Sequence, residues 1–319
     1  MIIGIDAMGG DYAPQVIIEA VQGLNISDFD VRLIGDKKKL IGKIPESKII
    51  HAPSIVEMDE SPQEAFRKKK DSSIAIGTKL QKKGEIDAFV GAGNTGAYVM
   101  FSLLELGRIK GIRRPALGTF FPSKNEYTFV LDVGAVTEVR PEDLYKFGVM
   151  GSLCVEGIIG KQNPKVALLS VGEEESKGSS LTKEAYDLMQ NSELNFLGNI
   201  EGHKILEGIA DVVVCDGVVG NVMLKFGESV IETTQSVIKG AIKSSLKAKL
   251  GGLLLKTAIK EHFSSLNYEK YGGAFLLGVK GVTIICHGRS NSTAIRNAIY
   301  TAARYVDSRV NKHIEQFFQ

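Results

Sequence analysis

The sequence predicts an α/β protein with a mainly parallel sheet flanked by helices, because one pattern recurs along its 319 residues. A short apolar run ends in a polar loop that contains glycine, and a segment with helical spacing follows. The apolar runs are continuous rather than alternating, which is typical of strands buried on both faces. The pattern predicts strands at residues 1–6, 31–35, 48–51, 87–90, 116–121, 127–131, 166–170, 211–215 and 282–286.

The length suits one large α/β unit over residues 1–319, built either as a single body or as two lobes around a cleft. A net charge of +2 gives no argument for nucleic acid as a partner. Three cysteines, each within an apolar run, are expected to be buried thiols in a reducing compartment. No signal peptide is recognisable and no apolar run is long enough to cross a bilayer, so we expect a cytoplasmic protein, partly associated with the inner face of the cell membrane.

Glycines and polar side chains follow the predicted strands, and these residues form the candidate site. Loops after parallel strands share one edge of a sheet, where ligands bind, so we expect the residues to meet. Glycines allow backbone N–H groups to approach an anion closely. The candidates are Asp6, Gly9, Gly10, Gly93, Asn94, Thr95, Gly96, Asp132, Gly134, Glu173, Lys177, Asp216, Gly217, Gly220, Asn221, Lys225, His287, Arg289 and Asn291.

Gly91, Gly93 and Gly96 match the dinucleotide-binding pattern G-x-G-x-x-G. Such a site also needs an acidic residue at the end of the next strand, where it binds the ribose hydroxyls. The next predicted strand runs into residues 122–124, which are Pro-Ser-Lys and contain no acid. We therefore interpret the glycines as a turn that presents a helix N-terminus to a phosphate, with a turn needed only for packing as the alternative.

Other chemistries lack their motifs in this sequence. The five histidines are scattered, and neither H-E-x-x-H nor C-x-x-C occurs, so no metal site is expected. G-x-S-x-G and G-x-x-x-x-G-K-[ST] are also missing, which argues against a hydrolase triad and against ATP hydrolysis. The remaining residues favour the binding of an anion without a metal or another cofactor.

Several short motifs, taken together and in order, resemble the bacterial acyl-ACP:phosphate acyltransferase family, which starts phospholipid synthesis. The resemblance runs from Ile2 to about Ile299 and depends on the motifs as an ordered set. The motifs are Asp6-Ala-Met-Gly-Gly-Asp11, Gly93-Asn-Thr-Gly96, Leu131-Asp-Val-Gly-Ala135, Gly172-Glu-Glu with Lys177-Gly178, Gly198-Asn-Ile-Glu-Gly202, Asp216-Gly with Gly220-Asn221, Tyr271-Gly-Gly-Ala274 and Cys286-His-Gly288.

The resemblance implies transfer of a long-chain acyl group from acyl carrier protein to inorganic phosphate. It also implies a homodimer, and a fold related to the phosphotransacetylase and isocitrate dehydrogenase-like group. The acyl phosphate product would then be used at the membrane. The chain departs from the family pattern at Val136, where an asparagine is usual, and at Phe275, where a proline is usual, so neither residue is placed in the site.

A thioester is already activated, so no covalent acyl-enzyme is required. Binding phosphate beside the carbonyl carbon accelerates the reaction through proximity, and hydrogen-bond donors aimed at the developing oxyanion account for the rest of the rate enhancement. Lys177, Lys225 and Arg289 could neutralise the charge of phosphate. For the carboxylates of Asp132 and Asp216, the alternative to a catalytic role is the capping of a loop or of a helix N-terminus. The expected catalytic residues are Asn94, Asp132, Asp216, Asn221 and His287.

Residues 236–270 combine many lysines with apolar residues at helical spacing, and Gly251-Gly252 interrupts the pattern. The segment predicts two protruding amphipathic helices with a glycine hinge. Three roles stay open: contact with an anionic membrane, docking of acidic acyl carrier protein, and packing in a dimer. The expected membrane-facing residues are Leu254, Leu255, Lys256, Ala258, Ile259 and Lys260.

Three competing functions are distinguishable by experiment. A phosphotransacetylase would prefer small acyl-CoA donors, and a decarboxylating dehydrogenase would reduce a nicotinamide. A membrane scaffold without activity would bind lipid and show no phosphate-dependent turnover. The sequence leaves open the preferred acyl length, the identity of a general base, and the regulation of membrane binding.

Overall fold

The computed structural model describes residues 1–25, 28–265 and 272–319, and it contains one sheet of eleven strands. The strand order is β3-β2-β1-β4-β11-β10-β5-β6-β9-β7-β8. All nine expected strands are present, and two further strands, β8 and β10, were not expected. The strands are β1 (Ile2–Asp6), β2 (Asp30–Gly35), β3 (Ile49–His51), β4 (Ala88–Gly91), β5 (Ala116–Ser123), β6 (Glu126–Leu131), β7 (Lys165–Leu169), β8 (Asn195–Ile200), β9 (Val212–Val214), β10 (Ala274–Leu277) and β11 (Val282–Ile285).

The sheet consists of two parallel groups that run in opposite directions. Strands β3, β2, β1, β4 and β11 are parallel to one another, and so are β6, β9, β7 and β8. Between the groups, β10 is antiparallel to β11 and β5, and β5 is antiparallel to β6. The expectation that all strand-end loops share one edge is therefore wrong for the whole sheet and holds only within each group.

The carboxyl ends of four central strands nevertheless lie at one level of the sheet. A continuous row of paired residues crosses the centre, formed by Val90, Ile284, Phe275, Gly118, Leu131 and Val214. This row contains the last residue of β6 and of β9, and the last but one of β4 and of β11. The loops that follow β4 and β11 and those that follow β6 and β9 therefore start from the same row.

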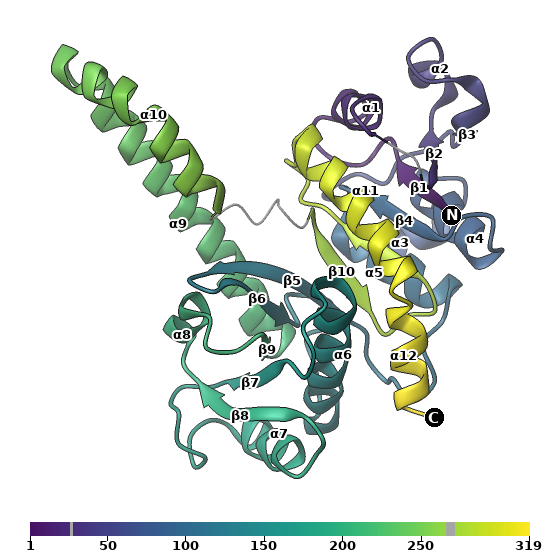
Figure 1. Cartoon of the computed structure of the whole chain (residues 1–319). Helices are drawn as coiled ribbons and strands as arrows, with labels where there is room; N and C mark the ends of the chain where they lie inside the picture. Colours follow the sequence, from purple (N-terminus) through teal and green to yellow (C-terminus); the bar gives the residue numbers. More distant parts are fainter. Residues whose placement is uncertain (26–27, 266–271) are drawn as a thin grey trace.

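Helices cover both faces of the sheet, and the molecule has two lobes (Figure 1). One lobe contains β1–β4 with α11, and the other contains β5–β9 with α6. All three cysteines are buried, as expected. The helices of eight residues or more are α1 (Gln15–Gln22), α4 (Ser73–Lys82), α5 (Thr95–Glu105), α6 (Pro141–Ile159), α7 (Ser180–Gln190), α9 (Gly217–Lys243), α10 (Leu246–Ser265), α11 (Ser292–Asp307) and α12 (Val310–Phe317). The shorter ones are α2 (Lys37–Leu40), α3 (Pro62–Lys68), α8 (Gly202–Glu207) and the 3₁₀ turn η1 (Glu46–Lys48).

Helices α9 and α10 form an antiparallel pair that projects from the body (Figure 1). The chain turns at Ser244, and the hydroxyl of Ser245 then caps α10 by accepting the N–H of Ala248. The predicted hinge at Gly251-Gly252 is wrong, because both glycines lie inside α10. A Cβ at Gly252 would lie 2.5 Å from the side chain of Ile242, so this glycine allows the two helices to pack closely.

Candidate functional site

The loops after β1, β4 and β11 meet in a glycine cluster. A Cβ built on Gly9 would lie 2.9 Å from the backbone nitrogen of Gly93, and one built on Gly10 would lie 3.1 Å from the carbonyl oxygen of Gly288. The N–H of Asp11 donates to that same carbonyl at 2.8 Å. The structure therefore brings together Gly9, Gly10 and Gly93, as the sequence predicts, and it adds Gly288.

Asp6 is hydrogen-bonded to the loop after β1 in this cluster and to α5. Its side chain accepts the backbone N–H groups of Met8 and Gly9 and the hydroxyl of Tyr98 at 2.6 Å. Both Asp6 and Tyr98 are fully buried. Burial raises the pKa of Asp6 above its usual range, and the hydrogen bonds from Tyr98 and the two N–H groups lower it in part. Asp6 thus links the loop after β1 to helix α5.

Asn94 is buried, and both the oxygen and the nitrogen of its side-chain amide make hydrogen bonds. Its Oδ1 accepts the N–H of Ala97 and so caps α5, while its Nδ2 donates to the carbonyl oxygens of Glu57, Met58 and Glu60. These contacts fix the loop at 57–60 against the glycine cluster, with Thr95 and Gly96 at the start of α5 beside it. A direct catalytic role for Asn94 stays a prediction.

A second cluster lies at the ends of β6 and β9, around Asp132. The buried carboxylate of Asp132 accepts four backbone N–H groups at 2.9–3.0 Å, from Leu117, Gly134, Ala135 and Val136. Burial raises the pKa of Asp132, and these hydrogen bonds offset part of that rise. The N–H of Gly134, expected to bind phosphate, therefore donates to Asp132 in this structure.

The N-terminus of α9 packs directly on the Asp132 loop. Asp216 caps the helix by accepting the N–H groups of Val218 and Val219, each at 3.0 Å. A Cβ at Gly217 would lie 2.1 Å from the carbonyl oxygen of Val136. Gly134 lies against the side chain of Asn221, which is partly exposed. Asp132, Gly134, Asp216, Gly217, Gly220 and Asn221 are thus one cluster, as expected from the sequence.

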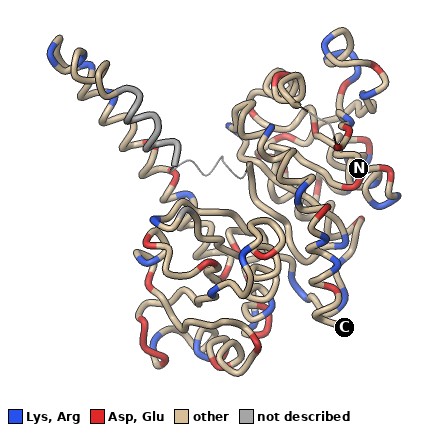
Figure 2. The backbone as a smooth tube through the Cα atoms, viewed as in Figure 1, with Lys and Arg blue, Asp and Glu red and all other residues tan. Residues whose placement is uncertain are grey.

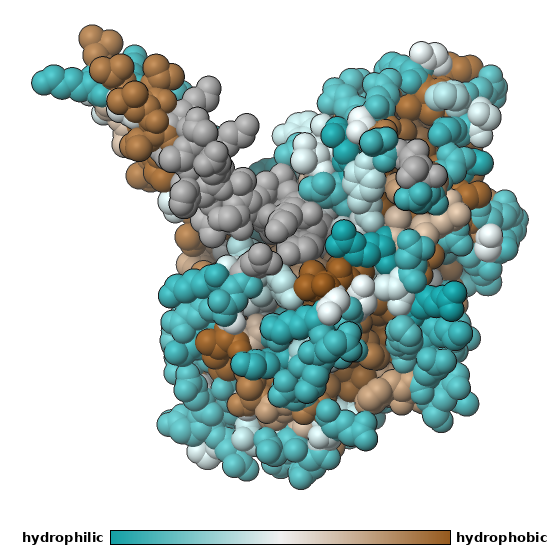
Figure 3. Space-filling model, viewed as in Figure 1, coloured by the Kyte–Doolittle hydropathy of each residue, from teal (hydrophilic) through white to brown (hydrophobic). Residues whose placement is uncertain are grey.

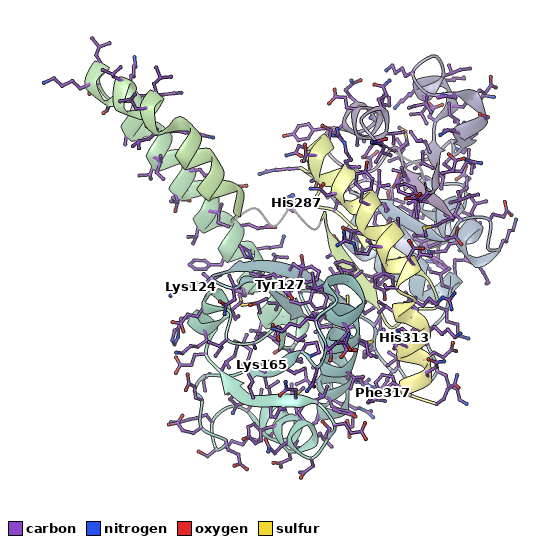
Figure 4. The ribbon with its side chains drawn as sticks, viewed as in Figure 1. Lys124, Tyr127, Lys165, His287, His313 and Phe317 are labelled. Atoms are coloured by element: carbon purple, nitrogen blue, oxygen red, sulfur yellow. The ribbon has the colours of Figure 1, made fainter. Side chains whose placement is uncertain are left out.

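A contact links the loop after β11, in the glycine cluster, to the middle of α9. His287, in the loop after β11, has its Nε2 at 3.9 Å from a carboxylate oxygen of Glu228 on α9. His287 lies between the lobe of β1–β4 and the base of the projecting pair (Figure 4). In the same loop, the exposed Arg289 approaches Asp11 at 3.8 Å, and Asn291 caps α11 by accepting the N–H of Ala294.

The remaining candidates lie further out. Glu173 and Lys177 are exposed in the loop after β7, and this loop is held to β8 by the side chain of Asn199, which donates to the carbonyl oxygen of Glu174. Lys225 is exposed on α9, one turn beyond Asn221. Among the described residues, no three His, Cys, Asp or Glu side chains gather closely enough to bind a metal ion.

The capping role that was the alternative for the carboxylates is confirmed for Asp6, Asp132 and Asp216. Each binds N–H groups of the loop or helix that follows it, so these loops are ordered before any ligand arrives. The polar side chains of Asn221, His287 and Arg289 are partly or fully exposed at these loops. They are available to bind an anion, and they are supported on loops that are already hydrogen-bonded.

Sequence reasoning missed Tyr98 and Glu228. Tyr98 stands four residues after the cap Asn94 and therefore lies one turn along the same helix, which is the available signal. Glu228 lies on α9 and is brought to His287 only by the tertiary fold.

The outer part of the α9–α10 pair exposes both apolar and basic side chains. Leu254 and Leu255 are exposed, as expected, whereas the side chains of Lys256, Ala258, Ile259 and Lys260 lie outside the described residues. Apolar residues cover much of the far end in Figure 3, and Lys or Arg residues mark it in Figure 2. Within the part of the chain that the structure describes, no helix is both long and apolar enough to cross a membrane.

Solved structures of low sequence identity share this fold. The EutD phosphotransacetylase from Staphylococcus aureus aligns with a TM-score of 0.62 at 18% identity, covering 96% of this chain and 94% of that protein. A phosphotransacetylase from Streptococcus pyogenes aligns with a TM-score of 0.63 at 17% identity, covering the same shares. The expected relation to the phosphotransacetylase group is therefore confirmed at the level of the fold.

Relatives of much higher identity cover almost the whole chain. A protein from Thermoanaerobacterium thermosaccharolyticum, named phosphate acyltransferase, is 44% identical over 99% of this chain and 96% of its own length. Another of that name, from Desulfitobacterium hafniense, is 47% identical over 97% of this chain and 95% of its own length. The family model described as "Fatty acid synthesis protein" matches residues 1–313. The chain therefore belongs to this family of fatty acid synthesis proteins.

Proposed function

We propose that this protein is a phosphate acyltransferase that moves a long-chain acyl group from acyl carrier protein to inorganic phosphate. The observation that carries the proposal is the match to relatives of that name, at 44–47% identity over nearly the full chain. The proposed site is the space between the glycine cluster and the N-terminus of α9, where Asn221, His287 and Arg289 surround the acceptor.

The reaction needs no covalent intermediate. A phosphate oxygen attacks the thioester carbonyl, the new C–O bond forms, and the C–S bond breaks. The proton lost by phosphate ends on the carrier thiol, and the products are acyl phosphate and free carrier protein. The ordered loops contribute by fixing the side chains that position phosphate and stabilise the oxyanion.

The test is phosphate-dependent release of free thiol from hexadecanoyl carrier protein. We expect Asn221→Ala to lower kcat/KM with a raised KM for phosphate, because Asn221 lies on the rim beside Gly134. Asn94→Ala is expected to lower activity by loosening the loop at 57–60. Folded variants of both residues with wild-type kinetics would show that the site is elsewhere.

The competing proposal, a phosphotransacetylase for small acyl-CoA, has the fold of its structural neighbours in its favour. A comparison of hexadecanoyl carrier protein with acetyl-CoA as donor separates the two. A clear preference for acetyl-CoA would favour the competitor.

For the α9–α10 pair we favour contact with an anionic membrane over docking of the carrier protein, and a homodimer remains compatible with either. Support comes from the exposed Leu253, Leu254 and Leu255 in a segment that is rich in lysine. Leu254→Glu is expected to weaken sedimentation with phosphatidylglycerol vesicles, with Leu104→Glu, an exposed position on α5, as the control. Equal sedimentation of wild type and Leu254→Glu would overturn the membrane assignment.

A further inference from the structure

A groove of about 390 Å³ lies between the end of β5, helix α8 and the middle of α9. This volume falls within the roughly 300–1,000 Å³ that is usual for ligand sites. Among the described residues that line the groove, every side chain except that of Glu228 is apolar. Phe121, Leu206, Leu224 and Val230 form part of its wall.

Helix α9 leads from the proposed acceptor site at its N-terminus to the groove along its middle. Its wall on this helix extends from Met223 to Ile231, about 12 Å along the axis at 1.5 Å per residue. Met223 stands two residues after Asn221 in the second cluster. The one charged lining residue, Glu228, is the residue that approaches His287. The groove therefore begins within one turn of Asn221, and its charged residue lies at the contact with His287.

We propose that this groove binds the hydrocarbon chain of the acyl donor. The inference rests on the proposed function, because the chain and the carbonyl that phosphate attacks belong to one molecule. Their two sites must therefore adjoin, and the described lining of the groove is apolar except at Glu228, which approaches His287. Transfer of apolar carbons from water to such a surface contributes about 0.8 kcal/mol per methylene.

The test fills the groove with a larger side chain. Val230→Trp places an indole at the wall, and Val237→Trp, two turns further out on the same helix, is the matched control. We expect Val230→Trp to raise the KM for hexadecanoyl carrier protein at least tenfold, which corresponds to about 1.4 kcal/mol. The KM for butanoyl carrier protein and for phosphate is expected to stay within about twofold. Val230 lies nine residues beyond Asn221, about 13 Å along α9, and a butanoyl chain is too short to reach it.

A binding measurement separates this inference from the proposed function. cis-Parinaric acid, a fluorescent fatty acid, is expected to bind wild type and Val237→Trp and to bind Val230→Trp at least tenfold more weakly. If wild type turns over neither donor, the proposed function fails, while probe binding still tests the groove. If Val230→Trp misfolds, Leu206→Glu supplies the same test from α8.

Two results would overturn the inference. One is an unchanged ratio of hexadecanoyl to butanoyl activity in folded Val230→Trp and Leu206→Glu. The other is a change in oligomeric mass by sedimentation without a change in that ratio, which would identify the groove as an interface between copies of the chain.

Discussion

Gly220 sets the distance between α9 and the Asp132 loop, and its replacement by alanine tests the geometry of the site. An alanine Cβ would lie 1.9 Å from the carbonyl oxygen of Asp132 and 2.9 Å from Cys215 Sγ. Real Cβ atoms essentially never come closer than 3.0 Å, so the helix or the loop must move by at least 1.1 Å, the difference between 3.0 and 1.9. The alanine Cβ is bonded directly to the backbone, and the oxygen of Asp132 is a backbone atom, so no side-chain rotation relieves the clash.

Two effects follow from a shift of this size. Overpacking of a tight contact costs about 1–3 kcal/mol of unfolding free energy. Displacement of Asn221 by about 1 Å relative to the glycine cluster lowers kcat/KM by about 100-fold, because positioned groups lose their alignment with the reacting atoms. We therefore expect Gly220→Ala to be less stable and almost inactive in the phosphate-dependent assay.

Gly240→Ala on the same helix is the matched control. Outside its own helix, no atom of the described residues lies within 4 Å of the position of its Cβ, so the main expected change is in helix propensity. This variant is expected to gain about 0.5–1 kcal/mol of stability, with unchanged kinetics. Urea unfolding and the thiol-release assay measure both variants. A folded Gly220→Ala with wild-type kcat/KM would refute the claim that the contact between α9 and the Asp132 loop positions the site.

Three further predictions concern buried contacts. Tyr98→Phe removes the hydroxyl that donates to Asp6, and we expect a loss of about 1.5–3 kcal/mol in urea unfolding at pH 7, since the acceptor is a buried carboxylate. Asp6→Asn removes a carboxyl group whose pKa is raised in the folded state. The stability of wild type relative to this variant should therefore fall as the pH rises from the unfolded pKa, about 3.9, through the higher folded pKa. A stability difference that stays flat between pH 4 and 7 would contradict the burial effect. Gly251→Ala should slow hydrogen exchange in α10, because its Cβ meets no atom of the described residues within 4 Å outside its own helix. Gly252→Ala should speed it, because its Cβ meets Ile242, and equal effects would mean that the two helices do not pack as described.

The strands were predictable because their apolar runs are continuous, whereas the direction of half the sheet was missed. Two residues, 124 and 125, separate β5 from β6. Parallel strands need a crossover of a dozen residues or more, so this short connection requires an antiparallel hairpin. That hairpin reverses the direction of the second group. Strand β8 was missed because its sequence, Asn195–Ile200, mixes asparagine and glycine into the apolar run.

The loops of the site were also predictable, but the use of their N–H groups was not correctly assigned. Glycine after a strand marks a loop with accessible backbone, so phosphate was the expected acceptor for these N–H donors. The structure gives many of them to the aspartate that opens the loop, at Asp6, Asp132 and Asp216. An aspartate two to four residues before the donor is the local signal for such a turn. No local signal reveals the Glu228–His287 contact, since 59 residues separate the two.

Helix α9 takes part in the proposed acceptor site, in the apolar groove and in the projecting pair, so a movement of this helix would affect all three. Its 27 residues span about 40 Å at 1.5 Å per residue. The first turn contacts the Asp132 loop, the middle lines the apolar groove, and the outer part projects with α10 (Figure 1). A helix held at its base by backbone contacts at Gly217 and Gly220 has little freedom to tilt without moving Asn221. Forces on the projecting pair, from a membrane or a partner, therefore act on the groove and the acceptor site through one rigid element.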